Sequence, residues 1–203
     1  MKRILISQRR DAIPGRKEER DATDTRIGKI LFELGFLPIF LCSDIVEHDR
    51  YLSALQPDGF LLGSGNDLGE FPQRDSLEES MLNYARLACL PVFAICRGAQ
   101  MLNQFQGGTV RPVTGHVATR LRLVGPWAAD LGYSEINSYH NFAITPETLG
   151  HDLRALASTA DGVIKAIQHR TLPWLGIMWH PEREPELLRA DARLITRVFD
   201  REI

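Results

Sequence analysis

Residues 91–108 read PVFAICRGAQMLNQFQGG and pass from a short apolar run into an amphipathic stretch. The run at 91–96 has the length and composition of a buried strand. The stretch after it has one apolar helical face, made by Ala99, Met101, Leu102 and Phe105. Gly107 and Gly108 favour the end of that helix. Cys96 is thereby predicted to lie where a strand ends and a helix begins.

Strands and helices alternate along the first half of the chain. Short apolar runs predict further strands at 3–7, 35–41 and 59–64. Periodic stretches predict the helices between them, at 19–34, 47–55 and 76–89. Gly35 is expected to terminate the first helix. The predicted strands are apolar on both faces, which is typical of a parallel sheet covered on both sides.

The second half is richer in extended segments, predicted at 120–124, 134–138, 162–168 and 172–179, and a last helix is predicted from Glu184 to the end. The whole pattern predicts an α/β fold with a mostly parallel central sheet, right-handed crossovers and helices on both faces. No repeat, low-complexity segment or linker interrupts the pattern. Residues 1–203 are therefore expected to form a single domain.

The bulk composition is that of an ordinary soluble protein. The chain has 203 residues, of which 44% are hydrophobic and 25% charged, with a formal net charge of −2. Without a basic surplus, neither nucleic acid nor a membrane is an expected partner. The apolar run ILI near the N-terminus is too short for a signal peptide, so a cytoplasmic location is expected. Three cysteines argue against a disulfide framework, and Cys42 and Cys89 are expected to be inert core residues.

Small residues frame the third cysteine. Ala94 and Gly98 lie two positions before and after Cys96, the offsets that a nucleophile elbow requires because strand and helix backbones cross closely there. A thiol at a helix N-terminus is favoured as the reactive thiolate, and Arg97 would add positive potential. An inert core cysteine remains the alternative until a base is found.

A candidate base follows the last extended segment, in the stretch MWHPER at 178–183. In extended chain, which Pro181 favours, side chains two positions apart point the same way. Glu182 could then orient His180 toward Cys96, which is the arrangement of a cysteine–histidine catalyst. Alone, the stretch would be interpreted as a surface turn before a helix. Together with the elbow cysteine, it favours a catalytic triad.

These motifs carry a family resemblance. AICRGAQMLN…GGTV together with GIMWHPE resembles the class I glutamine amidotransferase superfamily, and within it the γ-glutamyl hydrolases of peptidase family C26. GFLLGSGNDL at 59–68 resembles the oxyanion loop of that family, and NSYHNFAI at 137–144 resembles a segment opposite the nucleophile. The resemblance covers nearly the whole chain and implies a flavodoxin-like arrangement of the sheet.

The resemblance also implies a mechanism. Cys96 would attack a γ-glutamyl amide, His180 would move the proton to the leaving amine, and Glu182 would hold His180. A γ-glutamyl thioester would form, and water would release glutamate. The remaining implied site residues are the oxyanion donors Gly63, Ser64, Gly65 and Arg97, the glutamyl-binding Gln100, and Ser138, Tyr139 and His140 opposite the nucleophile. A solvent-facing Gln100 and a structural His140 remain alternatives. Asn141 and Phe142 depart from the histidine–glutamine pair of many family members, so leaving-group contacts should differ.

The segment after the first predicted strand is basic, with Arg9, Arg10, Arg16, Lys17, Arg20 and Arg26. A solvated charged loop is the default interpretation, and a phosphate or nucleotide grip on the leaving group is the functional alternative. SQR at 7–9 and ERDATD at 19–24 resemble the γ-glutamyl-CDP-amidate hydrolases of capsule phosphoramidate synthesis. That resemblance implies release of glutamate and cytidine diphosphoramidate.

Other functions stay open at this point. A γ-glutamyl-GABA or γ-glutamyl-polyamine hydrolase and a glutaminase subunit with a separate synthase partner share the same three residues. A non-catalytic or redox-sensing relative is disfavoured because the cysteine, histidine and glutamate are all present. His116, His140 and His180 lack metal-ligand spacing, and no phosphate or dinucleotide motif occurs, so no metal or cofactor is expected. The expected partner is a small γ-glutamyl substrate, and homo-oligomer formation is left open.

Overall fold

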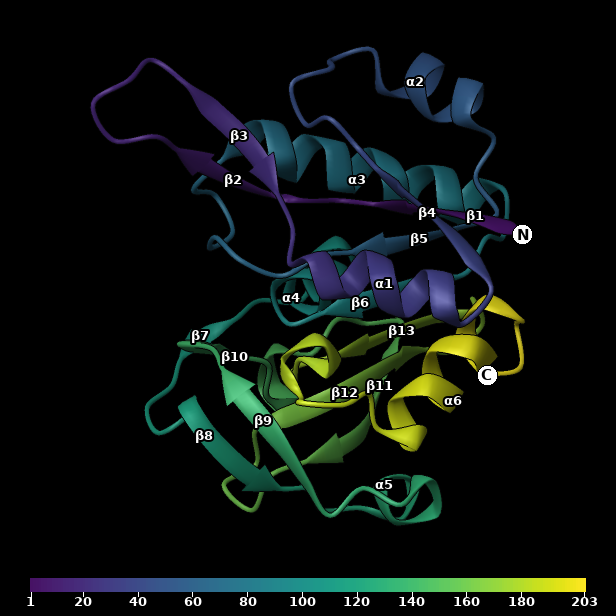
Figure 1. The fold of residues 1–203 in the computed structure, drawn as a ribbon. Coiled ribbons are helices and arrows are strands. Elements are labelled where there is room, and N and C mark those ends of the chain that lie inside the picture. Colours follow the sequence, from purple (N-terminus) through teal and green to yellow (C-terminus); the bar gives the residue numbers. More distant parts are fainter.

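A seven-stranded sheet with the order β11-β12-β13-β6-β5-β1-β4 crosses the molecule in the computed structural model, which describes residues 1–203 (Figure 1). Its parallel strands are β1 (Lys2–Ile6), β4 (Phe36–Phe40), β5 (Gly59–Leu62), β6 (Val92–Ile95) and β13 (Trp174–Ile177). Counted along the chain, these five lie in the order 2-1-3-4-5, the flavodoxin-like order. β12 (Ile164–His169) and β11 (Leu153–Ser158) extend the sheet antiparallel. The predicted fold class is confirmed.

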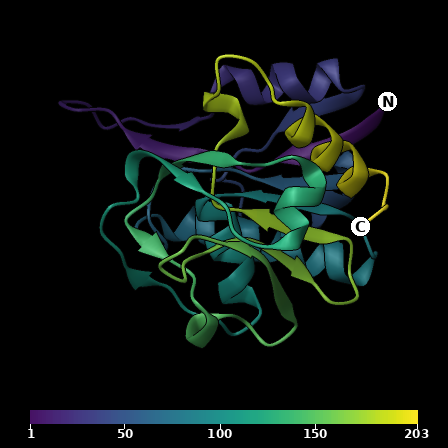
Figure 2. The same ribbon diagram turned by 90° about the horizontal axis from the view of Figure 1, so that it is seen from below.

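Helices cover both faces of the sheet, as Figure 2 shows from below. One apolar cluster joins the sheet to α1 (Thr25–Glu33) and α6 (Arg189–Phe199). The opposite cluster contains side chains of α2 (His48–Leu55), α3 (Pro72–Leu87) and α4 (Arg97–Phe105). Every residue of β5, β6 and β13 is buried between the two layers. The edge strand β4 differs from the prediction, because Leu37 and Phe40 remain exposed where no strand covers its outer side.

Smaller elements surround one end of the sheet. β8 (Val117–Arg122) pairs antiparallel with β9 (Glu135–Tyr139), and α5 (Pro126–Leu131) lies between them in the chain. β7 (Arg111–Pro112) pairs with β10 (Phe142–Ala143). Two 3-10 turns, η1 (Pro146–Thr148) and η2 (Pro181–Arg183), complete the structure. No helix combines the length and the apolarity needed to cross a bilayer.

The helix predicted at 19–34 is wrong in its first part. β2 (Arg9–Ala12) and β3 (Glu19–Ala22) form an antiparallel hairpin that projects from the body of the molecule (Figure 1). The buried Arg10 guanidinium of β2 pairs with Glu19 of β3, a cross-strand contact that favours the hairpin. The helix begins after Asp24, whose carboxylate accepts a hydrogen bond from the Arg26 N–H at 3.0 Å.

Three further expectations are corrected. The last helix begins at Arg189 rather than Glu184, because Pro181 and Pro185 break the helical hydrogen bonding before it. β7, β10, β11 and α5 were not predicted, since they are short or lack an apolar alternation. Cys42 and Cys89 are exposed rather than buried, because both lie in connections that follow a core element.

Candidate active site

The predicted nucleophile elbow is a tight connection between β6 and α4. Cys96 has φ 51° and ψ −104°, a backbone conformation that side-chain-bearing residues rarely adopt and that is often found at functional sites. Its N–H donates to the Ile177 carbonyl at 2.7 Å, and its own carbonyl accepts the Gln100 N–H at 3.1 Å. The Cys96 backbone thus continues the β6–β13 ladder and also begins α4.

Small residues let α4 lie directly on the sheet. A Cβ on Gly98 would overlap the carbonyl oxygen of Leu62 in β5. A Cβ on Gly176 in β13 would stand 2.9 Å from the Cβ of Ala99. The sequence predicted this close approach, because Gly98 lies two positions after the cysteine. Gly176 lies on β13, the strand next to β6, and its lack of a side chain also leaves room for α4.

His180 and Glu182 contact each other beyond the end of β13. The His180 Nδ1 lies 2.7 Å from the Glu182 Oε1, and both side chains are buried. The contact forms across the 3-10 turn η2 rather than in extended chain, so the predicted pairing occurs through a different backbone geometry.

His180 is also the candidate base for Cys96. Burial lowers the pKa of His180, but its interactions with Cys96 and Glu182 raise it to about 9. The other ring nitrogen of His180, Nε2, is buried and has no hydrogen-bond partner. The raised pKa favours an imidazolium beside the thiol at neutral pH.

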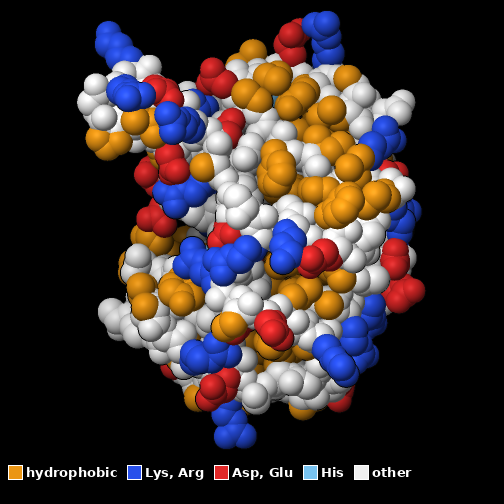
Figure 3. Space-filling model, viewed as in Figure 1, with side chains coloured by type: hydrophobic (Ala, Val, Ile, Leu, Met, Phe, Trp, Pro, Cys, Tyr) orange, Lys and Arg blue, Asp and Glu red, His pale blue; other side chains and the backbone are white.

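Cys96 and His180 line one pocket of about 310 Å³. Three arginines, Arg9, Arg97 and Arg183, and two carboxylates, Asp67 and Glu70, also line it. The Arg183 guanidinium lies over the Tyr139 ring, 4.4 Å from its centre, and forms none of the ion pairs of the structure. Figure 3 shows basic and acidic side chains gathered on the face beneath the projecting hairpin. No group of three or more His, Cys, Asp or Glu side chains is placed to hold a metal ion.

The predicted oxyanion loop reaches this pocket only in part. Gly65 lines it, together with Asn66, which the sequence did not single out. The Gly63 N–H donates to the Ser7 Oγ at 3.0 Å and is thereby occupied, while Ser64 lines a separate small cavity. The Arg97 side chain is buried between Asp75 and Glu78 and brings no free charge, but its N–H is the first of α4.

The segment 137–144, predicted to lie opposite the nucleophile, divides between pocket and core. Tyr139 and His140 line the pocket, and the Tyr139 ring meets His180 edge-on at 5.7 Å between ring centres. Ser138 does not line it, because its Oγ donates to the His116 carbonyl at 2.9 Å. Gln100 lines the pocket while its Nε2 donates to the Phe142 carbonyl at 3.0 Å.

Comparison with known proteins places this arrangement in a family. The profile of the peptidase C26 family matches residues 63–182. A gamma-glutamyl-CDP-amidate hydrolase of Campylobacter jejuni is 33% identical over 195 residues, which cover 89% of this chain and 90% of that protein. The chain belongs to the peptidase C26 family. It is thereby a hydrolase with a glutamine amidotransferase-like fold.

Two further matches to this C26 hydrolase cover less of the chain or show lower identity. Anthranilate synthase component 2 of Azospirillum brasilense is 31% identical over 134 residues, covering 64% of this chain and 67% of that protein. A solved structure described as a GMP synthase subunit from Thermoplasma acidophilum superposes with a TM-score of 0.73 and 20% identity, over 100% of this chain and 96% of that one. The structural match shows the fold alone.

Sequence reasoning missed Asn137, which fixes the backbone of His180 in this C26 hydrolase. The Asn137 Oδ1 accepts the His180 N–H at 2.9 Å, and its Nδ2 donates to the His180 carbonyl at 2.8 Å. Asn137 lies just before the SYH residues at 138–140, so its place in that segment was the available signal.

A second missed residue is Lys165, a fully buried lysine in β12. Its Nζ lies 2.6 Å from the His140 Nε2, 2.9 Å from the His116 Nδ1 and 3.0 Å from the Ser138 Oγ. An ammonium group only donates, so each imidazole must offer a lone pair to it. His140 is then protonated at Nδ1, and burial together with the Lys165 charge lowers its pKa to about 3.

Proposed function

We propose that this C26 hydrolase cleaves a γ-glutamyl amide through a γ-glutamyl thioester on Cys96. The observation that carries the proposal is the cysteine at the β6–α4 elbow, in one pocket with an imidazole that a buried carboxylate holds at 2.7 Å. The match to the gamma-glutamyl-CDP-amidate hydrolase over 90% of its length supports the bond class. The chain acts as a hydrolase on the γ-glutamyl C–N bond.

The first half-reaction transfers the glutamyl group to sulfur. The Cys96 thiolate attacks the γ-carbonyl carbon, a C–S bond forms, and the carbonyl π electrons move onto oxygen. The N–H of Arg97 and the loop N–H groups around Gly65 stabilise that oxyanion. When the tetrahedral intermediate collapses, the C–N bond breaks and the amine leaves with a proton from the His180 imidazolium. A protonated His180 in the resting enzyme suits this order, because its pKa is raised to about 9.

The second half-reaction returns the free enzyme. The now neutral imidazole of His180 takes a proton from water, whose oxygen attacks the thioester carbonyl. Collapse breaks the C–S bond, releases glutamate and restores the thiolate–imidazolium pair. Glu182 holds the Nδ1 proton of His180 throughout and so keeps Nε2 available for both transfers.

The charges of the pocket fit a γ-glutamyl substrate. The α-ammonium of a glutamyl group suits the carboxylates of Asp67 and Glu70, and its α-carboxylate suits an arginine. Gln100 and His140 offer further polar contacts on the opposite wall. The test is glutamate release from L-γ-glutamyl-p-nitroanilide, with Cys96→Ala as the inactive control. Equal glutamate release by both proteins would reject the thioester.

We further propose that the natural leaving group is cytidine diphosphoramidate, which would place the enzyme in capsule phosphoramidate synthesis. Two observations support a phosphate-bearing amine: the name and near full-length coverage of the Campylobacter relative, and the arginines Arg9 and Arg183 at the pocket. The same arginines disfavour a cationic polyamine leaving group, and they leave γ-glutamyl-GABA as the alternative.

A substrate panel separates these choices. Purified enzyme is supplied with γ-glutamyl-CDP-amidate, γ-glutamyl-GABA or γ-glutamyl-putrescine, and kcat/KM for glutamate release is compared. We expect the diphosphate compound to be preferred by at least tenfold. Good turnover of γ-glutamyl-GABA with none of the diphosphate compound would overturn the assignment while leaving the γ-glutamyl hydrolase activity intact.

The similarity to anthranilate synthase component 2 favours a second candidate, a glutaminase subunit that works with a separate synthase. Such a subunit would hydrolyse glutamine and deliver ammonia to its partner. The discriminating measurement is glutaminase activity of the isolated chain and of the chain mixed with a cell extract of its source. Glutamine hydrolysis that requires the extract would favour this candidate over the hydrolase of a small metabolite.

A further inference from the structure

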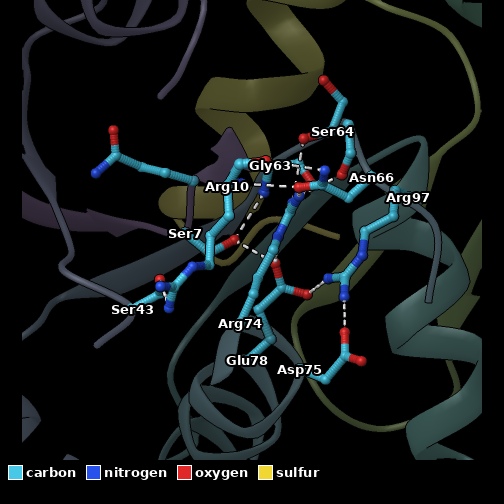
Figure 4. Close-up of polar contacts among 12 residues, drawn as sticks. Ser7, Arg10, Ser43, Gly63, Ser64, Asn66, Arg74, Asp75, Glu78 and Arg97 are labelled. Atoms are coloured by element: carbon cyan, nitrogen blue, oxygen red, sulfur yellow. Dashed lines mark hydrogen bonds and ion pairs between the residues drawn. The ribbon is translucent and has the colours of Figure 1, made fainter. Parts of the chain in front are cut away.

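One buried guanidinium organises the loop at 63–66 (Figure 4). Arg74 lies in the first turns of α3 with no exposed surface, and burial lowers its pKa only to about 10, so it stays charged at neutral pH. Its Nη2 donates to the carbonyl oxygens of Gly63 at 2.7 Å and Ser64 at 3.1 Å. Its Nη1 donates to the Gly65 carbonyl and to the Asn66 Oδ1, the latter at 3.3 Å.

Arg74 has no donor left unused. Its Nε donates to the Glu78 Oε1 at 2.9 Å, so the five N–H groups of the guanidinium meet five acceptors. Four of these acceptors belong to the loop 63–66. A lysine at this position would offer three donors from one point and could not reach the same set of oxygens.

The carbonyl contacts decide where the loop N–H groups point. In a trans peptide the carbonyl oxygen and the following N–H lie on opposite sides of the bond. With the carbonyls of 63, 64 and 65 drawn toward Arg74, the N–H groups of Ser64, Gly65 and Asn66 are directed away from it. None of these three N–H groups has a hydrogen-bond partner. Gly65 and Asn66 line the pocket that contains Cys96.

The same network reaches the other oxyanion donor. Glu78 also accepts hydrogen bonds from the Ser7 Oγ at 2.7 Å and from the Arg97 guanidinium, whose own backbone N–H follows Cys96. Arg97 pairs in addition with Asp75. Two guanidiniums and two carboxylates thus form one buried, charge-balanced unit that contacts both the loop and the elbow.

We propose that Arg74 is a positioning residue that sets the peptide planes of residues 63–66, so that the N–H groups of Gly65 and Asn66 are presented to the oxyanion of the tetrahedral intermediate. This rests on the thioester mechanism proposed above. Arg74 itself touches no reacting atom. Because the oxyanion exists only in the transition state and intermediate, the loop orientation contributes to kcat and little to substrate binding.

The test uses Arg74→Lys, which keeps a cation beside Glu78 but cannot hold the four loop oxygens. With L-γ-glutamyl-p-nitroanilide, we expect kcat to fall roughly 10²-fold and KM to stay within about threefold. Affinity for the same compound should be equal in Cys96→Ala and in the double variant with Arg74→Lys. A crystal structure of Arg74→Lys should show at least one peptide of 63–66 turned over.

Matched variants control for general damage. Arg3→Lys alters a half-buried arginine that pairs with Asp58 at the amino-terminal end of β1, away from the pocket, and we expect its kcat to remain within about twofold of wild type. If Arg74→Lys fails to fold, Ser7→Ala tests the same loop, because Ser7 accepts the Gly63 N–H and bonds Glu78. It should lower kcat several-fold without changing KM.

Each outcome bears on a separate claim. The inference is overturned if folded Arg74→Lys keeps wild-type kcat, if its kcat loss is matched by lost affinity in the Cys96→Ala background, or if its loop peptides are unchanged. If the wild-type enzyme cleaves no γ-glutamyl compound, the proposed function fails. The loop geometry of the Arg74→Lys crystal structure then decides the positioning role by itself.

Discussion

Glu182 acts on the site through a single imidazole nitrogen. Because its carboxylate holds the Nδ1 of His180 at 2.7 Å, it fixes both the ring and its tautomer. In Glu182→Gln the amide keeps the shape but loses the charge. We expect kcat for glutamate release to fall by roughly 10²-fold or more with KM little changed. A variant that retains wild-type kcat would show that His180 needs no anionic partner.

The protonation of His180 predicts an alkaline limit to activity. Its pKa is raised to about 9 in the folded protein from an ordinary value of 6.5. Activity should therefore fall as pH rises through about 9, where the imidazolium that donates to the leaving amine is lost. The stability that the charged ring contributes is fully present below about 6.5 and is lost as pH rises from there to about 9.

A profile of kcat/KM from pH 6 to 10 measures this limit. In Glu182→Gln the alkaline limb of the residual activity should move to lower pH, because one of the groups that raise the pKa of His180 is gone. An identical limb in the variant would assign it to another group.

Lys165 bonds the Nε2 of His140 and, together with burial, lowers the pKa of that imidazole. In Lys165→Met the cation that bonds the His140 Nε2 at 2.6 Å is removed, so the pKa of His140 should rise from about 3 toward its ordinary range. Imidazole ¹⁵N chemical shifts, followed from pH 4 to 8, would report both the pKa and the tautomer. The exposed Lys29→Met serves as the control and should leave His140 unchanged. Unaltered His140 shifts in Lys165→Met would contradict this interpretation.

At the scale of elements, the crossing of α4 over β5 limits what position 98 can hold. In Gly98→Ala the new methyl group would overlap the Leu62 carbonyl, which is backbone and cannot move aside alone. We expect a loss of about 2 kcal/mol or more in the free energy of unfolding, because helix and strand must separate. Denaturant unfolding measures it. Gly28→Ala is the matched control, since its methyl would meet only the ring of Phe40.

The parallel core and the elbow could be predicted because both depend on local patterns. Apolar runs on both faces marked β5, β6 and β13, and the small residues around Cys96 marked the junction after β6. The 9–22 hairpin could not be predicted in this way. Its strands are polar, and their pairing depends on contacts such as Arg10 with Glu19 rather than on burial of an apolar face.

Lys165 was missed for a topological reason. The rule that ligands bind beyond the carboxyl ends of parallel strands directs attention to residues that follow strands. β12 runs antiparallel to β13, so its amino-terminal end, with Lys165, lies at the edge where the parallel strands finish. Asn66 and Arg74 were missed because their roles depend on the path of the loop 63–66, which no periodicity encodes.

For the molecule as a whole, the arrangement of charge predicts how salt affects binding. The net charge is only −2, but Arg9 and Arg183 stand together at the pocket. If the leaving group carries phosphates, KM for γ-glutamyl-CDP-amidate should rise several-fold between about 50 mM and about 300 mM salt, because screening weakens the attraction. KM for L-γ-glutamyl-p-nitroanilide, with its uncharged leaving group, should rise less.

The variant Arg183→Gln tests whether this arginine causes the salt effect on KM. Arg183 packs on the Tyr139 ring and pairs with no carboxylate, so its removal leaves no carboxylate unpaired. The variant should raise KM for the diphosphate compound and flatten its dependence on salt. An equal salt response for both compounds would remove the arginines from leaving-group recognition.

The exposure of Cys42 and Cys89 has a practical consequence for anyone who labels this enzyme. Iodoacetamide or a maleimide dye will react at two exposed sulfurs that lie outside the pocket of Cys96, so the number of adducts and the loss of activity will not correspond. A single-thiol form removes the ambiguity. Serine suits position 42, whereas position 89, with φ 50°, is better filled by glycine. Mass spectrometry of that form would then report on Cys96 alone.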